Sequence, residues 1–161
     1  MPAYISLGSN CGNSPANLEN ALEAISKLPG VQVLLASRIY KTEPQEDPNQ
    51  PWFFNQAALL NTGLAPHELL AGLQKIETAL GRVRDPQQRF GPRTIDLDLL
   101  YMDGIELNTP QLILPHPRMW QRAFVLAPLL DIAGKPLLEM AETALSELNY
   151  RLDNDKIYQN G

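Results

Sequence analysis

Apolar residues recur along the first 102 positions at two spacings, one typical of strands and one typical of helices. Alternation at every second position predicts strands, and repeats of three or four positions predict helices. Ser14 is expected to cap the first helix, with Pro15 at its first position and Gly30 at its end. The predicted elements are, in chain order, a strand at 3–7, a helix at 14–30, strands at 31–40 and 53–61, a helix at 65–81, a strand at 94–102 and a short strand at 112–114.

The main elements follow one another as strand, helix, strand, strand, helix and strand. This order predicts a ferredoxin-like split βαβ sandwich of the α+β class, in which helices cover one face of an antiparallel sheet. Residues 115–161 are expected to add extra C-terminal helices, near 120–132 and 138–148, packed on the same core. The sequence has no linker that would divide it, so residues 1–161 are expected to form a single domain.

The composition is that of a water-soluble globular chain. Of the 161 residues, 44% are hydrophobic and 19% are charged, and the net charge is −5. This acidic balance is unlike that of general nucleic-acid binders, so no nucleic-acid partner is expected. No apolar run approaches the roughly 18 residues of a membrane helix, and no basic residue precedes the first apolar run as in a secretory signal. We therefore expect a cytoplasmic protein without a membrane partner, whose lone Cys11 forms no internal disulfide.

Two aspartates in the strand at 94–102 are the first candidates for chemistry. Asp96 and Asp98 are expected to share one face of the strand. Two carboxylates this close repel each other unless a cation lies between them. Mg²⁺ binds one or two carboxylates and keeps positions for substrate phosphates. The alternative is a solvated polar face on an edge strand. The apolar residues of the strand are expected on the opposite face: Ile95, Leu97, Leu99 and Tyr101.

Arginines cluster directly before this strand. Six of the eight arginines lie between positions 82 and 122, and that span contains no lysine. Arginine forms forked, bidentate contacts with phosphate oxygens, so a carboxylate pair beside an arginine cluster indicates phosphoryl chemistry rather than a solvated basic loop. The sequence has no Gly-rich P-loop, so side chains and metal would have to hold a nucleotide. The cluster consists of Arg82, Arg84, Arg89 and Arg93, with Asp85 as its single acid.

Other polar and aromatic residues are weaker candidates. Gln74 and Glu77 are expected on the helix face away from the apolar stripe, where they either meet a ribose or adenine or form a solvated surface. His116 lies between two prolines and is either structural or functional. A flat polar heterocycle suits an aromatic ring that stacks on it and an amide that reads its edge. The candidates for such a pocket, which on their own are equally ordinary core residues, are Thr42, Phe53, Asn55 and Phe124.

Several ordered segments together resemble the 6-hydroxymethyl-7,8-dihydropterin pyrophosphokinase family of folate biosynthesis. The longest is RFGPRTIDLDLL at 89–100. The others are YISLGSN at 4–10, YKT at 40–42, FFN at 53–55, GRVR at 81–84 and PHP at 115–117. The resemblance spans about residues 3–130, and the ordered set is specific although no single piece is.

This resemblance implies a monomeric ferredoxin-like enzyme that transfers the β,γ-pyrophosphoryl unit of ATP to the hydroxymethyl group of the dihydropterin and releases AMP. It implies two Mg²⁺ ions bound by Asp96 and Asp98, with ATP as co-substrate. The residues implied in catalysis are Arg82, Arg93, Asp96 and Asp98. Those implied on the ATP side are Gln74, Glu77, Arg82, Arg84, Arg93, Leu99, His116 and Arg122. Those implied around the pterin are Thr42, Pro44, Phe53, Asn55, Phe90, Asp96 and Phe124, with the ring stacked between Phe53 and Phe124.

The resemblance also implies two mobile loops, at 43–52 and 82–91, that close over the substrates. The sequence departs from the family at Phe90, where Trp is common, at Glu43, where Pro is common, and over its last thirty residues. Gln111 and Ile113 replace polar or basic residues that some members use. One alternative is a non-catalytic ferredoxin-like regulatory module that binds a metabolite, which would need no aspartate pair beside arginines. Another is an RNA-binding sheet, which would need exposed aromatics and a basic surface.

Overall fold

The computed structural model describes residues 1–44, 49–81 and 94–159. Within these residues, seven strands form one mostly antiparallel sheet in the order β5-β1-β4-β3-β9-β8, with β2 also paired to β4. The strands are β1 (Pro2–Ser9), β2 (Val31–Ala36), β3 (Tyr40–Thr42), β4 (Phe53–Thr62), β5 (Asp96–Met102), β8 (Tyr150–Asp153) and β9 (Lys156–Gln159), with β6 (Leu107–Asn108) and β7 (Ile113–Leu114) as a separate pair. The helices are α1 (Ser14–Ser26), α2 (Pro66–Ala79), α3 (Ala123–Leu130) and α4 (Leu137–Ser146), with a 3₁₀ turn at Met119–Gln121.

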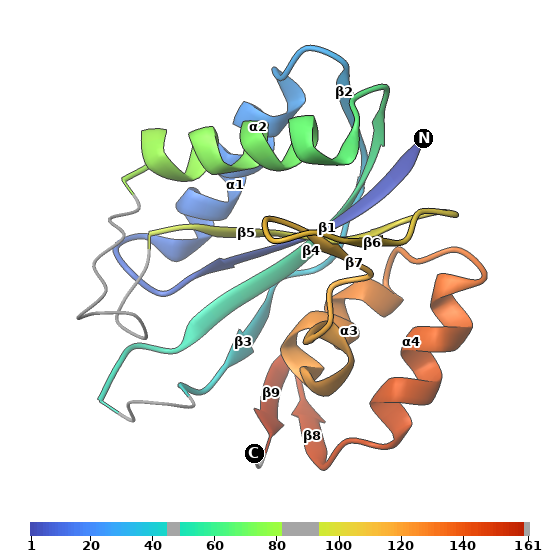
Figure 1. Ribbon diagram of the computed structural model, residues 1–161. Coiled ribbons are helices and arrows are strands. Elements are labelled where there is room, and N and C mark those ends of the chain that lie inside the picture. Colours follow the sequence, from blue (N-terminus) through green and yellow to red (C-terminus); the bar gives the residue numbers. More distant parts are fainter. Residues whose placement is uncertain (45–48, 82–93, 160–161) are drawn as a thin grey trace.

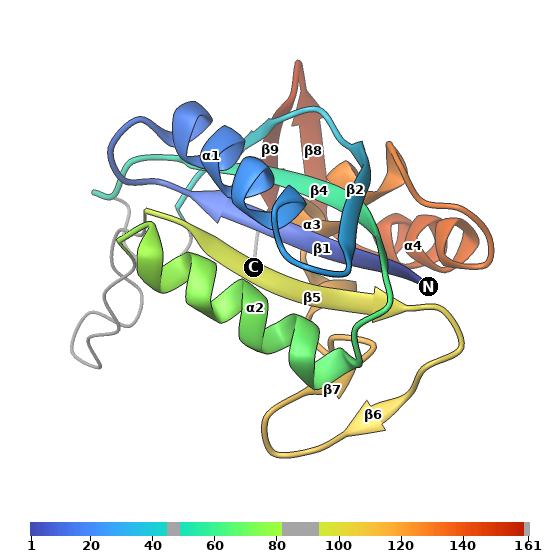
Figure 2. The same ribbon diagram turned by 90° about the horizontal axis from the view of Figure 1, so that it is seen from above.

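Helices cover both faces of the sheet, α1 and α2 on one and α3 and α4 on the other (Figure 1; Figure 2). Each face has its own cluster of buried apolar residues. In β1, Ile5 and Leu7 belong to the cluster under α1 and α2, whereas Tyr4 belongs to the cluster under α3 and α4. Both faces of the central strands are therefore apolar and need a covering layer. The prediction that the C-terminal helices pack on the same core is wrong, because they build a second one.

The ends of α1 differ from the sequence-based expectation. Asn13, rather than Ser14, caps the helix, because its side chain accepts a hydrogen bond from a backbone N–H of the first turn. Ser14 is the first helical residue, and its hydroxyl accepts a hydrogen bond from Ser9 at 3.1 Å. The helix ends at Ser26, and Gly30, with a φ of +79°, makes the turn into β2. Only glycine adopts such a φ without steric cost.

The strand expected at 31–40 is interrupted at Ser37. The Ser37 N–H donates to the carbonyl of Ala57 at 2.8 Å, and its hydroxyl accepts from the Ala57 N–H at 2.9 Å. The hydroxyl thus takes the place of a ladder carbonyl. As a result β4 pairs with β2 along 58–62 and with β3 along 53–55. This break places Tyr40 and Thr42 beside the start of β4.

A bulge between β1 and β5 changes which residues share a face. Leu100 is the extra residue, because Tyr4 pairs with Tyr101 and Ile5 pairs with Leu99. An extra residue reverses the alternation of side chains beyond it. Leu99 lies in the cluster under α1 and α2, whereas Tyr101 lies in the cluster under α3 and α4. The prediction that Tyr101 faces away from the two aspartates is therefore wrong.

The C-terminal segment forms a β-hairpin, β8–β9, that the apolar pattern does not predict. Its turn contains Asn154 and Asp155, with φ values of +46° and +63°. Strand β9 pairs in parallel with β3, so the hairpin extends the main sheet. Across the described ranges, we find no helix whose length and hydrophobicity would let it span a membrane.

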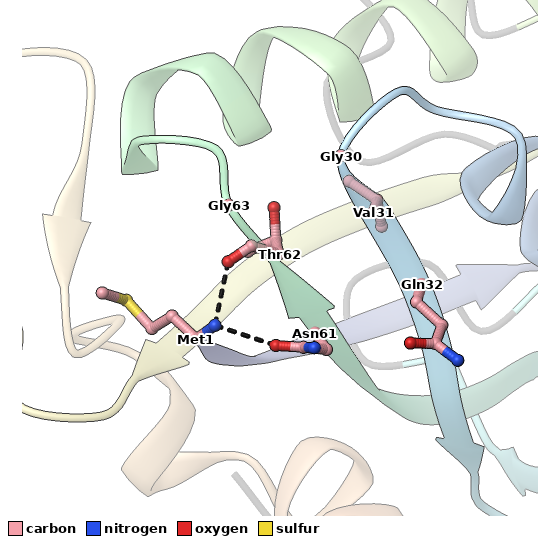
Figure 3. A pocket seen from close by; sticks show the side chains of 7 residues that line it. All are labelled: Met1, Gly30, Val31, Gln32, Asn61, Thr62 and Gly63. Carbon is pink, nitrogen blue, oxygen red and sulfur yellow. Dashed lines mark hydrogen bonds between the residues drawn. The ribbon is translucent and has the colours of Figure 1, made fainter.

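A hollow lies at the start of β1, at the end of the sheet away from Asp96 (Figure 3). There the N-terminal ammonium group donates to the side-chain oxygen of Asn61 at 2.8 Å and to the carbonyl of Thr62 at 2.9 Å. No lining residue has an ionisable side chain, so the hollow offers little catalytic chemistry. It is lined by Met1, Gly30, Val31, Gln32, Asn61, Thr62 and Gly63.

Candidate active site

A row of directly paired residues crosses the sheet at the other end of β1. Gly8 pairs with Asp96 of β5 on one side and with Asn55 of β4 on the other, and Asn55 pairs with Tyr40 of β3. Directly paired residues project on the same face of a sheet. Asp98 follows two positions after Asp96 and shares that face. The register thus gathers side chains from three strands on the face that carries α3.

The two aspartates are both half-buried, and Leu97 between them is buried in the opposite cluster. The predicted alternation is confirmed for these three residues. No group of three or more histidine, cysteine or acidic side chains suited to a metal occurs among the residues that the structure describes. A pair of carboxylates fits Mg²⁺ best, because this ion completes its shell with water and phosphate oxygens.

Glu77 of α2 holds the strand that carries the aspartates. Its Oε2 accepts a hydrogen bond from the Leu97 N–H at 2.8 Å, and its side chain is only 3% exposed. Because α2 runs beside the outer edge of β5 (Figure 2), this carboxylate satisfies an edge peptide group that β1 cannot reach. The prediction that Glu77 lies with Gln74 on the helix face away from the apolar stripe is wrong, because Glu77 is buried with that stripe. Gln74 alone is exposed.

Leu99 is 2% exposed, and its side chain lies in the cluster under α1 and α2, away from the aspartates. Leu99 pairs with Ile5, and Leu97 pairs with Leu7 two positions earlier. Hydrogen-bonded and non-hydrogen-bonded pairs alternate along an antiparallel ladder, so these two pairs are both of the non-hydrogen-bonded type. The peptide groups of Leu99 therefore point to the same outer edge as the Leu97 N–H. Any contact of Leu99 with a nucleotide would come from these main-chain groups.

Asn55 and Thr42 form a buried polar pair beside Gly8. The Asn55 Nδ2 donates to the Thr42 Oγ1 at 2.7 Å, and the two residues are 4% and 2% exposed. A Cβ added to Gly8 would lie 3.3 Å from the Asn55 Oδ1, so this oxygen lies directly over the backbone of β1. Phe53, half-buried, precedes Asn55 by two positions and shares its face. Pro44, also half-buried, lies just after the end of β3.

The start of α3 supplies a cation and an aromatic ring near the aspartates. Burial lowers the pKa of the Arg122 guanidinium, and the negative charges of Asp98 and Asp96 act in the opposite direction. The guanidinium is therefore within electrostatic range of both carboxylates. Its Cζ lies 5.6 Å from the centre of the Phe124 ring, a cation–π arrangement.

His116 is fixed by its backbone and by its ring. Its N–H donates to the carbonyl of Leu100 at 2.8 Å, and its Nδ1 accepts a hydrogen bond from the Arg118 N–H at 3.2 Å. Burial lowers the pKa of His116, and the positive charges of Arg122 and Arg118 lower it further. At pH 7 the imidazole is therefore neutral, and its proton lies on Nε2, which is a hydrogen-bond donor.

The model of the 7,8-dihydro-6-hydroxymethylpterin-pyrophosphokinase family matches residues 4–134 of the chain. The chain belongs to this family. It is 43% identical over 149 residues to the 2-amino-4-hydroxy-6-hydroxymethyldihydropteridine pyrophosphokinase of Methylorubrum extorquens, with 91% of this chain and 93% of that protein covered. It is 46% identical over 130 residues to the enzyme of the same name from Bacillus subtilis, with 81% of this chain and 77% of that protein covered.

A solved structure with the same fold is the wild-type HPPK-DHPS of Plasmodium falciparum with pteroate. The TM-score is 0.64 at 12% identity, and 97% of this pyrophosphokinase-family chain is covered. The chain spans 47% of the length of that solved protein. At this identity the comparison supports the mixed α/β architecture, and the family assignment rests on the sequence matches.

Several residues expected in a pyrophosphokinase site lie outside the described ranges. They are Arg82, Arg84, Phe90 and Arg93, and Arg89 of the arginine cluster also lies there. The contacts expected of them stay predictions. The strand register brings Asp96, Asp98, Asn55 and Thr42 to one face of the sheet, and Arg122 and Phe124 meet at the start of α3. The Gln74 side chain is exposed on α2, the Leu99 side chain is buried under α1 and α2, and the Glu77 carboxylate lies at the outer edge of β5.

Gly8 is part of the site but not one of the residues singled out from the sequence. It lies between Asp96 and Asn55, and its missing side chain leaves the space over β1 that the Asn55 oxygen occupies. A glycine inside a strand weakens the strand and often marks a close approach by another group. The apolar pattern ends the predicted strand at residue 7, whereas β1 continues to Ser9, so Gly8 did not stand out as a glycine inside a strand.

Proposed function

We propose that this chain transfers the β,γ-pyrophosphoryl unit of ATP to the hydroxymethyl group of 6-hydroxymethyl-7,8-dihydropterin, with AMP and the pterin diphosphate as products, in tetrahydrofolate biosynthesis. The observation that carries the proposal is the row of Asp96, Gly8 and Asn55 across three strands in a chain of the pyrophosphokinase family. In this row the Asp96–Asp98 carboxylates, which suit a metal–phosphate complex, lie near the buried amide of Asn55, which suits a heterocycle.

The pterin side of the site is assigned to the Asn55–Thr42 pair, Phe53 and Phe124. A buried amide bonded at 2.7 Å to a buried hydroxyl is held in one orientation, so it can read one hydrogen-bonding edge of a flat ring. Phe53 belongs to β4 and projects on the face of the sheet that carries α3. Phe124 belongs to α3 itself. Two aromatic rings from different elements suit stacking on both sides of a pterin.

The ATP side is assigned to Arg122 and His116, with Gln74, Glu77 and the main chain of Leu99 along β5. Arg122 supplies a half-buried positive charge within electrostatic range of the aspartates, and His116 supplies a neutral Nε2–H donor. Among the residues beyond the described ranges, Arg82, Arg84 and Arg93 are proposed to complete the phosphate contacts, and Phe90 to cover the pterin. Arg82 and Arg93 are the proposed catalytic arginines.

Asp96 and Asp98 are proposed to hold two Mg²⁺ ions together with ATP. Bound there, the metal would neutralise phosphate oxygens and orient the triphosphate. The chain itself contributes the rigid strand, with Glu77 bonded to the peptide between the two carboxylates. In the transfer, the pterin hydroxyl oxygen bonds to the β-phosphorus, the bond from that phosphorus to the α-phosphate bridging oxygen breaks, and AMP leaves with that oxygen. The hydroxyl proton passes to solvent.

Two structural assignments accompany this function. The spatial order β5-β1-β4-β2, with α1 and α2 on one face, supports a ferredoxin-like split βαβ frame to which the C-terminal elements are added. Residues 1–161 are proposed to act as one domain, because α1–α4 pack on the two faces of one sheet, and as a monomer, as the family resemblance implies.

The test is a single-turnover reaction of the purified protein with ATP, Mg²⁺ and 6-hydroxymethyl-7,8-dihydropterin, followed by phosphorus NMR. We expect AMP and a pterin diphosphate in equal amounts, and no product without Mg²⁺. ADP with a pterin monophosphate would identify an ordinary kinase. Binding of the pterin without any phosphoryl product would instead favour the non-catalytic regulatory module.

A further inference from the structure

Helix α3 begins at a residue that does not cap it. Arg122 is the N-cap residue, with φ −118° and ψ 103°, and its side chain makes no capping hydrogen bond. The first N–H groups of a helix have no partner within the helix. The group that satisfies the Ala123 N–H therefore helps to set the direction in which Arg122 and Phe124 point.

That group comes from the last described residue of the chain. The Gln159 Oε1 accepts a hydrogen bond from the Ala123 N–H at 2.8 Å, and its Nε2 donates to the carbonyl of Gln121 at 2.8 Å. These two peptide groups flank Arg122 on either side. Because an N–H can only donate and a carbonyl can only accept, an amide in this one orientation satisfies both.

The strand that carries Gln159 is itself held firmly. On the opposite side of β9, the Tyr158 ring meets the Trp52 ring edge to face, with centroids 5.5 Å apart. Trp52 lies directly before the first residue of β4, Phe53. Strand β9 also pairs with Lys41 and Thr42 of β3.

The turn of the same hairpin reaches the other end of α3. Arg38 bonds to Asp155 of the turn at 3.3 Å and to Asp131, the C-cap residue of α3, at 3.2 Å. The Tyr40 hydroxyl donates to the same Asp131 carboxylate at 2.9 Å. The hairpin thus holds α3 at both ends, directly at its start and through Arg38 at its end.

We propose that Gln159 is a positioning residue of the active site, which holds Arg122 and Phe124 in the orientation that substrates require. The inference rests on the proposed function, since those two side chains are its ATP-side and pterin-side contacts. The family match ends at residue 134, so the group that fixes this wall of the site lies outside the segment that the match covers.

The test compares Gln159→Glu and Gln159→Leu with the control Leu152→Ala in the full-length protein. Gln159→Glu keeps the shape and the bond from the Ala123 N–H but turns the second bond into a contact between two oxygens. Leu152 lies on the same hairpin, is 47% exposed, and tests whether any change there has the same effect. We expect about tenfold weaker binding of the dihydropterin and of ATP for both Gln159 variants, as for the loss of a hydrogen bond, and no change for Leu152→Ala.

A double-mutant cycle with Phe124→Ala separates positioning from a general weakening of the fold. If Gln159 acts through Phe124, Gln159→Glu should cost less than about twofold in dihydropterin affinity once Phe124 is gone. Hydrogen exchange at the Ala123 amide should be faster in Gln159→Leu. Equal losses with and without Phe124, unchanged affinity in Gln159→Glu, or unchanged exchange at Ala123 would each overturn the inference. A wild-type protein that binds neither substrate would overturn the proposed function itself, whatever the exchange at Ala123.

Discussion

Replacing Gly8 by alanine tests the row of paired residues most directly. Gly8 lies between Asp96 and Asn55, and the new Cβ would lie 3.3 Å from the Asn55 Oδ1. That separation is too short for a relaxed contact between carbon and oxygen, so one of the two groups has to move by a few tenths of an ångström. The φ of Gly8 is not among the positive values, so the substitution itself leaves the backbone unstrained.

The Asn55 side chain has little freedom to move. It is 4% exposed, and its Nδ2 is bonded at 2.7 Å to Thr42, which is 2% exposed. A shift of the amide lengthens this hydrogen bond, and leaving a buried polar group poorly satisfied costs about 1–3 kcal/mol. We expect a loss of about 1–2 kcal/mol in unfolding free energy, and about tenfold weaker binding of the dihydropterin, whose edge the amide is proposed to read.

Gly63→Ala is the matched control, because a Cβ there meets nothing within 4 Å and the φ of Gly63 is also not positive. Denaturant unfolding measures the stability of both variants, and titration calorimetry measures their affinity for dihydropterin and for ATP. ATP affinity should change much less than dihydropterin affinity in Gly8→Ala. Wild-type affinity for the dihydropterin in Gly8→Ala would refute the assignment of Asn55 to the pterin.

Three further substitutions test other parts of the site. Asp98→Asn should lower Mg²⁺-dependent release of AMP at least a hundredfold with little change in melting temperature, whereas Asp103→Asn, at the exposed end of the same strand, should leave turnover intact. Phe124→Ala should weaken dihydropterin binding about tenfold and ATP binding much less, because stacking adds about 0.5–1.5 kcal/mol to the area it buries; equal losses in calorimetry would contradict the assignment. The pKa of His116 should lie below 6.5 in an NMR titration, because burial and the charges of Arg122 and Arg118 disfavour its protonation. The unfolded chain then binds the proton first, so stability should fall as the pH drops below about 6.5, and His116→Gln should reduce that fall.

Strand alternation was sufficient to place Asp96 and Asp98 on one face, because that periodicity is local. It failed at Tyr101, since the bulge at Leu100 arises from pairing with β1 and leaves no mark in the sequence of β5 alone. It also could not bring Asp96 next to Gly8 and Asn55. That register depends on three strands that are far apart in the chain.

The misplacement of Glu77 has a different cause, because residue type was given more weight than helical periodicity. Glu77 follows Leu73 by four positions and precedes Leu80 by three, so it lies on the apolar stripe of α2. The helix runs beside the outer edge of β5, and a carboxylate bonded to the Leu97 N–H is stable there. A buried acid is costly unless it is hydrogen-bonded, so a sequence pattern places it in solvent by default. The β8–β9 hairpin did leave a signal. Asn154 and Asp155 lie between the paired residues Asp153 and Lys156, and asparagine and aspartate tolerate the positive φ of such turns.

The position of the site follows from how the second layer covers the sheet. On the face that carries α3, Tyr4, Leu100 and Ala57 are buried under apolar side chains of α3, whereas Gly8 and Asp96 occupy the same face beyond the start of that helix. Arg122 lies at this boundary, where the covering layer begins. Polar groups that are removed from water need hydrogen-bond partners. The Asn55–Thr42 bond satisfies the polar side chains on the sheet, and the Gln159–Ala123 bond satisfies the first N–H of α3. The part of this face that α3 covers stabilises the strands through apolar contacts, and the part with Gly8 and Asp96 is available for the proposed substrates.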